Sequence, residues 1–111
     1  RKLYEYRATV RGVYDADTIT VDIDLGFGLI YTGQKLRLLG IDAPEVRGKE
    51  RPEGLKSRDA LRDKILDKDI IIRTSKDKKG KYGRWLATII LDEVNLNEWL
   101  IAEGYAEEYK K

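Results

Sequence analysis

Residues 18–25 alternate between polar and apolar side chains more regularly than any other part of the chain. Because successive side chains of a β-strand point to opposite faces, this alternation predicts a strand with one apolar face. That face would carry Ile19, Val21, Ile23 and Leu25. Residues 4–14, 34–41, 69–74 and 85–91 also have the composition of strands. Between the second and third strands, the glycines of segment 26–33 predict a hairpin.

Two other segments have the spacing of helices. Residues 53–66 carry an apolar stripe, which predicts a helix with one buried face formed by Leu55, Leu61, Ile65 and Leu66. A last helix is expected to begin at Asn95 or Asn97, since either asparagine can accept a hydrogen bond from a free amide of the first turn. Gly104 is expected to end it.

The order of these elements is three strands, a helix, two strands and a helix. Five short strands with a helix between the third and the fourth predict a Greek-key barrel of the OB type, a mainly β member of the α+β class. A chain of 111 residues has the length of one domain, so we expect residues 1–111 to form a single unit.

Composition limits the chemistry that the chain can perform. Charged residues make up 38% and hydrophobic residues 41% of the sequence, which is typical of a folded protein, and the net charge is only +2. Histidine and cysteine are absent, which excludes imidazole and thiolate catalysis, disulfides and soft-metal sites. No apolar run is as long as a membrane span, so we expect no membrane partner. Neither a secretory signal nor any other feature of the sequence fixes the localisation.

Five charged residues in three separate segments are candidates for a catalytic site: Asp17, Arg37, Asp42, Glu45 and Arg84. Carboxylates can hold a hard divalent cation, and a further carboxylate can accept a proton from water. Arginine side chains match the geometry of phosphate with paired hydrogen bonds. Asp42 and Glu45 flank Pro44 and would repel each other, and a bound cation would relieve that repulsion. Together these side chains fit the hydrolysis of phosphodiesters.

The segments around these residues resemble the motifs of the staphylococcal nuclease (thermonuclease) family. They read Asp15-Ala16-Asp17-Thr18, then residues 37–45 (Arg-Leu-Leu-Gly-Ile-Asp-Ala-Pro-Glu), then Lys81-Tyr82-Gly83-Arg84. The resemblance covers nearly the whole chain. The connection from Asp17 to Arg37 is longer than in the best-known member of that family.

The resemblance implies a calcium-dependent phosphodiesterase that cleaves DNA and RNA and leaves 3′-phosphate ends. Calcium would be held by Asp17, by Asp42 and by the backbone carbonyl of Ala43. Glu45 would act as the general base toward water, and Arg37 and Arg84 would bind the phosphate that is cleaved. Lys81 and Tyr82 would contact the nucleotide. We expect a monomer whose partner is a nucleic acid.

Two other interpretations remain open at the level of sequence. The chain could be a nucleic-acid-binding module of the same fold with weak or no catalysis, although such modules tend to lose the carboxylates or arginines. It could also be a structural or protein-interaction domain in which the polar residues form a solvated face. The first alternative predicts DNA binding without cleavage, and the second predicts neither specific calcium binding nor nuclease activity.

Overall fold

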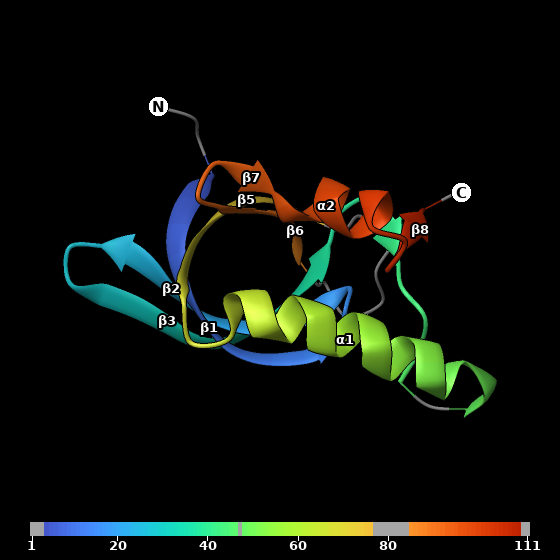
Figure 1. The fold of residues 1–111 in the computed structure, drawn as a ribbon. Coiled ribbons are helices and arrows are strands. Elements are labelled where there is room, and N and C mark those ends of the chain that lie inside the picture. The colour runs from blue at the N-terminus through green and yellow to red at the C-terminus, as the bar shows by residue number, and fades with distance from the viewer. Residues whose placement is uncertain (1–3, 47, 77–84, 110–111) are drawn as a thin grey trace.

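Five long strands form a closed barrel in the computed structural model, which describes residues 4–46, 48–76 and 85–109 (Figure 1). The elements in chain order are β1 (Glu5–Asp15), β2 (Thr18–Gly26), β3 (Leu29–Leu38), β4 (Ile41–Asp42), the 3-10 helix η1 (Gly48–Glu50), α1 (Arg51–Ile65), β5 (Asp69–Lys76), β6 (Trp85–Leu91), β7 (Val94–Asn95), α2 (Leu96–Ala102) and β8 (Glu107–Glu108).

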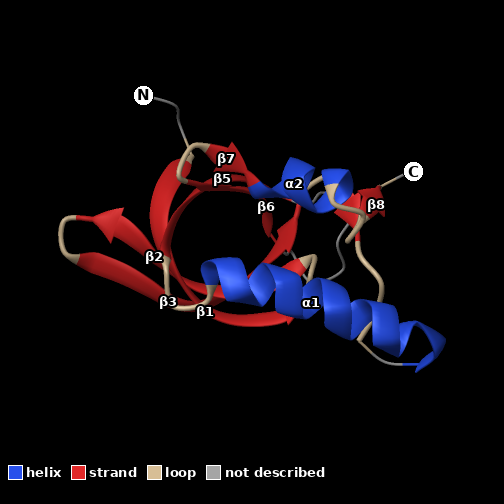
Figure 2. Cartoon of the chain, viewed as in Figure 1, coloured by secondary structure: helices blue, strands red, loops and turns tan. Residues whose placement is uncertain are grey.

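The barrel closes between two strands that are far apart in the sequence. Neighbouring strands pair in the order β3-β2-β1-β5-β6, and β3 pairs in parallel with β6 through Leu36↔Trp85, Arg37↔Leu86 and Leu38↔Ala87. The ring of strands and the two helices beside it are clear in Figure 2. This arrangement confirms the predicted OB-type barrel, with α1 before the fourth long strand and α2 near the C-terminus.

The alternation of β2 determines which of its side chains enter the core. Ile19, Val21 and Ile23 are buried, as predicted, but Leu25 is 45% exposed. The reason is that β2 and β3 continue beyond the barrel as a long hairpin, seen at the left of Figure 1. The third strand therefore begins at Leu29 rather than at residue 34. The tip of this hairpin exposes several apolar side chains: Leu25, Phe27, Leu29, Ile30 and Tyr31.

The buried face of α1 differs in part from the predicted one. Leu61 and Ile65 are fully buried, but the same face continues toward the start of the helix with Gly54 and Ser57. Leu55 and Leu66, which the periodicity had placed on this face, are only half-buried. Small residues occupy the first turns because backbone approaches the helix closely there, as described below.

The two asparagines near α2 have different roles. Asn95 is the N-cap, and its side chain accepts a hydrogen bond from the Glu98 amide at 3.2 Å. Asn97 is buried inside the helix and does not cap it. Gly104 has a positive φ of 79° just after the helix, which fits its predicted role as a stop. Within the described residues, neither helix has the length and apolar character needed to cross a bilayer.

Candidate functional site

The β2–β3 ladder places Asp17 next to the end of β3. Thr18 pairs with Arg37 across the ladder, and the backbone carbonyl of Asp17 accepts a hydrogen bond from the Leu38 amide at 2.8 Å. Asp17 therefore occupies the tight turn between β1 and β2, directly beside the strand that carries Arg37. Two residues that are twenty positions apart in the sequence are thus neighbours because of strand pairing alone.

The Asp17 carboxylate is buried and makes several hydrogen bonds. Its Oδ2 atom lies 2.9 Å from Arg37 Nη1 and accepts a hydrogen bond from the Ala43 amide at 3.0 Å. The Thr18 hydroxyl donates to Oδ1 at 3.2 Å. These contacts join the turn after β1, the end of β3 and the loop after β4 through one carboxylate.

Arg37 also lies close to Asp42. Its Nη2 atom is 4.0 Å from Asp42 Oδ1 and donates a hydrogen bond to the Ile41 carbonyl at 3.2 Å. Asp42 is largely exposed, whereas Asp17 is buried. Two predicted metal ligands thus face the same guanidinium group. The charge of Arg37 therefore offsets the repulsion between the Asp17 and Asp42 carboxylates.

Asp15 is a further acid in this region, which the sequence analysis did not assign to the site. Asp15 is buried beside Asp17, and its carboxylate accepts a hydrogen bond from the Asp17 amide at 3.1 Å. Burial, together with a hydrogen bond shared with the Asp17 carboxylate, raises the pKa of Asp15 to about 7.

The pKa of Asp17 is shifted in the opposite direction. Burial disfavours its charged form, but hydrogen bonds from Asp15, from the Ala43 amide and from Arg37 outweigh burial and hold the pKa of Asp17 below its usual value. Asp17 thus remains the charged member of the pair, and Asp15 holds the proton more readily. The Asp-x-Asp spacing in a turn was the one signal that could have indicated this pairing.

Glu45 occupies the loop that connects β4 to α1, three positions after Asp42. Its side chain is exposed, and no hydrogen bond or ion pair holds it within the described part of the chain. Its backbone packs closely against Gly54 in the first turn of α1. The position of Glu45 is therefore set by this backbone contact, while its carboxylate is exposed to solvent.

One aromatic side chain joins the site from the end of the described chain. β8 pairs with β4, so that Asp42 lies opposite Glu107, and the Tyr109 amide donates to the Gly40 carbonyl at 2.9 Å. The guanidinium carbon of Arg37 lies 5.7 Å from the centre of the Tyr109 ring. No local pattern in the sequence indicates this contact, because it depends on pairing between distant segments.

The remaining predicted residues, Lys81, Tyr82 and Arg84, lie outside the described residues. Among residues 4–46, 48–76 and 85–109, no three acidic side chains gather closely enough to form a metal-binding cluster. The available donors are the Asp17 and Asp42 carboxylates and the Ala43 carbonyl, all of them oxygen atoms. Such donors fit a hard cation. Both carboxylates already lie near one positive charge, that of Arg37.

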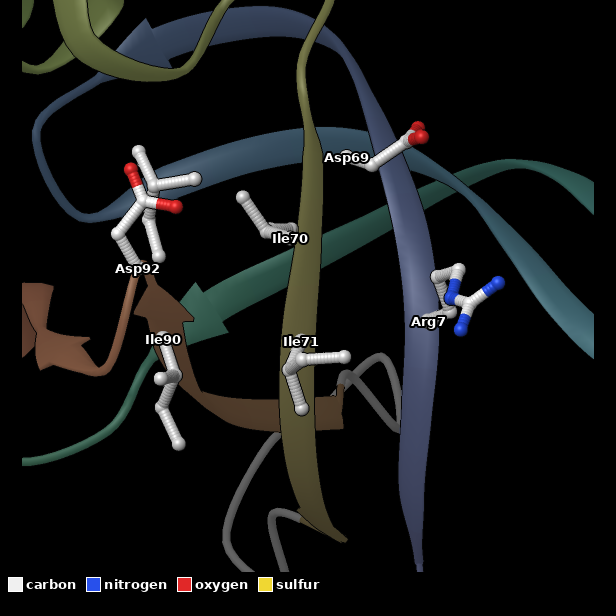
Figure 3. Close-up of a pocket in the computed structure, with 7 residues that line it drawn as sticks. Arg7, Asp69, Ile70, Ile71, Ile90 and Asp92 are labelled. Atoms are coloured by element: carbon white, nitrogen blue, oxygen red, sulfur yellow. The ribbon is translucent and has the colours of Figure 1, made fainter.

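A surface hollow lies away from these residues. It has a volume of about 290 Å³ and is formed by β1, β5, β6 and the turn after β6 (Figure 3). Its lining residues are Arg7, Asp69, Ile70, Ile71, Ile90, Leu91 and Asp92. It contains none of the residues that surround Arg37, and it is therefore not part of the candidate site.

Comparison with known proteins adds an independent observation. A family model described as "Staphylococcal nuclease homologue" matches residues 35–111. A thermonuclease of Staphylococcus hyicus is 33% identical over 97 residues, which cover 85% of this chain and 54% of that protein. An uncharacterized endonuclease of Haemophilus influenzae is 35% identical over 77 residues, covering 69% and 40% of the two chains.

An uncharacterized protein of Methanocaldococcus jannaschii is 30% identical over 129 aligned residues, which cover 94% of this chain and 59% of that protein. The chain thus spans about half the length of the curated relatives that it matches. The barrel and the similarity of sequence indicate the same family.

Proposed function

The chain belongs to the family of staphylococcal nuclease homologues, and on that premise we propose that it is a calcium-dependent nuclease acting on DNA or RNA. The observation that supports this most directly is the convergence of Asp17 and Asp42 on the guanidinium group of Arg37. Two carboxylates and an arginine that would bind phosphate are thereby gathered at the end of β3. Because histidine and cysteine are absent, hydrolysis must rely on groups of this kind.

We assign the general base to Glu45. An exposed carboxylate that no other side chain holds can accept a proton from water, which then attacks phosphorus in line with the leaving oxygen. The buried carboxylate of Asp17 is unsuited to this role because its hydrogen bonds already stabilise the charged form. Attack from the side opposite the 5′ oxygen would break the bond between phosphorus and that oxygen, and would leave a 3′-phosphate.

Calcium would be held by Asp17, Asp42 and the Ala43 carbonyl, and would neutralise charge on the phosphate. Arg37 is shared between Asp17 and Asp42 at present, and a phosphate group would compete for the same guanidinium donors. Arg84 directly precedes Trp85, whose strand partner Leu36 adjoins Arg37. The two arginines would stabilise the charge that develops on the phosphate oxygens.

The first test is hydrolysis of single-stranded DNA by the purified chain. We expect cleavage with calcium, none with EDTA and much slower cleavage with saturating magnesium. Calcium accepts variable oxygen geometry, whereas magnesium requires a tight octahedron and retains its waters. Equal rates with the two ions would contradict the proposed metal dependence. Binding of DNA without cleavage would support the alternative of an inactive nucleic-acid-binding module.

A second test concerns the metal ligands and uses thermal melting. Calcium is expected to raise the melting temperature because only the folded chain gathers the ligands, and Asp42→Asn is expected to abolish that shift. Asp42 is the better position to change, because Asp17→Asn would also remove the ion pair with Arg37 and lower the stability of the calcium-free protein. Asp63→Asn, on the exposed face of α1, is the matched control. An undiminished calcium shift in Asp42→Asn would place the metal elsewhere.

A further inference from the structure

Gly54 is in close contact with the backbone of Glu45. It is the first buried residue of α1, and a Cβ atom placed there would lie 2.9 Å from the Val46 nitrogen and closer still to the carbonyl carbon and oxygen of Glu45. Real Cβ atoms essentially never approach other atoms to within 3.0 Å. All three neighbours are backbone atoms, so no side-chain rotation could relieve the contact. A side chain at position 54 would therefore displace either the helix or the loop.

The helix is firmly held along the same face. The Ser57 hydroxyl donates a hydrogen bond to the Tyr105 carbonyl at 2.8 Å, one turn after Gly54. Leu61 and Ile65, one and two turns further on, are fully buried in the core. A retreat of the helix would break this hydrogen bond and open gaps around two closely packed side chains. The helix is therefore the element that resists displacement.

The described residues of the loop are held differently at its two ends. Its start is fixed by the hydrogen bond from the Ala43 amide to Asp17. Beyond Ala43, the side chain of Glu45 is exposed, and the Val46 carbonyl is held by a surface contact with Arg51 Nη1 at 3.2 Å. Pro44 and Val46 on either side of Glu45 are only half-buried. Displacement would therefore move Glu45 and leave Asp17 in place.

We propose that Gly54 is a positioning residue, which sets the place of Glu45 by letting the loop backbone lie directly against α1. This inference rests on the proposed role of Glu45 as general base. A side chain at position 54 would move the Glu45 backbone by about 1 Å, a displacement that can cost up to roughly 10²-fold in rate. The carboxylate would still be present, but its distance from the attacking water would no longer suit proton transfer.

The test is Gly54→Ala, with Gly12→Ala as the matched control. A Cβ at Gly12 would meet only Thr20 Cβ, at an ordinary distance of 3.9 Å. We expect Gly54→Ala to lower kcat by roughly 10- to 10²-fold with little change in KM. Displacing backbone atoms costs stability, so the melting temperature should fall. The better helix propensity of alanine should offset part of that fall. The Gly12→Ala variant should keep its kcat. A wild-type kcat in Gly54→Ala would overturn the proposal.

A double-mutant cycle separates positioning from general damage. If Gly54 acts through Glu45, Gly54→Ala should lower kcat much less in a Glu45→Gln background than in the wild type. Equal losses in both backgrounds would show that Gly54 acts by another route.

A readout without activity separates this inference from the proposed function. Amide NMR shifts of Glu45 and Val46 should move in Gly54→Ala, while those of Leu61 and Ile65 stay in place. The opposite pattern would mean that the helix had yielded, and would overturn the inference even if the wild type is a nuclease. If the wild type shows no cleavage, the nuclease function fails, and with it the positioning role, whatever the amide shifts show.

Discussion

Glu45→Gln is expected to lower kcat by roughly 10²–10⁴-fold, the range for loss of a general base. Glutamine has nearly the same shape as glutamate but cannot accept the proton of the attacking water. Folding should be almost unaffected, because the side chain is exposed and is held by no hydrogen bond or ion pair in the described part of the chain. Steady-state hydrolysis of DNA at saturating calcium, together with a thermal melt, measures both quantities.

The matched control for this change is Glu98→Gln. Glu98 is exposed in the first turn of α2, so its replacement removes the same charge away from Asp42 and Arg37. It should leave kcat unchanged. Retention of more than about a tenth of the wild-type kcat by Glu45→Gln would show that another group accepts the proton.

Asn97→Ala is expected to lower the free energy of unfolding by about 2–6 kcal/mol, since each of two groups left without a partner costs roughly 1–3 kcal/mol. The Asn97 amide oxygen accepts from the Ile89 amide at 3.1 Å, and its Nδ2 donates to Leu39 at 2.8 Å and to Ala87 at 3.0 Å. The Ala87 carbonyl keeps the Leu39 amide as a partner. The Ile89 amide and the Leu39 carbonyl lose their hydrogen-bond partners.

The same network stabilises the turn between β3 and β4, which lies between Arg37 and Asp42. Asn95→Ala is the matched control, because it removes only an exposed helix cap and should cost about 1 kcal/mol. Urea denaturation of both variants measures the two values. A similar cost for both variants would mean that water replaces the lost Asn97 contacts.

The fold could be predicted from the sequence because its strands and helices have strong local patterns. The alternation around Val21 marks a half-buried strand, and the order of elements then limits the fold to few arrangements. Asp17 and Arg37 were chosen for the chemistry of their side chains and for the motifs that contain them, and the pairing of β2 with β3 makes them neighbours. The position of the hairpin tip could not be predicted, because the exposed apolar residues after Ile23 continue the strand pattern beyond the barrel.

The missed features depend on contacts with distant backbone. Asn97 has the sequence context of a helix cap, but its partners lie on β6 and in the turn after β3, which no local pattern indicates. Gly54 interrupts a helical pattern and would be interpreted only as a weak helix former. The contact between Arg37 and Tyr109 requires β8 to pair with β4. Polar and glycine contacts of this kind carry no periodicity that can be recognised.

The parallel pairing between β3 and β6 has a consequence for the order of folding during synthesis. The hairpin that joins Asp17 to Arg37 can form as soon as β3 has been made, because its contacts are local. The edge of β3 stays unpaired until β6 follows, and closure over so long a loop is slow. Until then the nascent chain carries an open strand edge, which is a site for association with other chains. The contact between Asp17 and Arg37 thus forms early, and the barrel around it closes late.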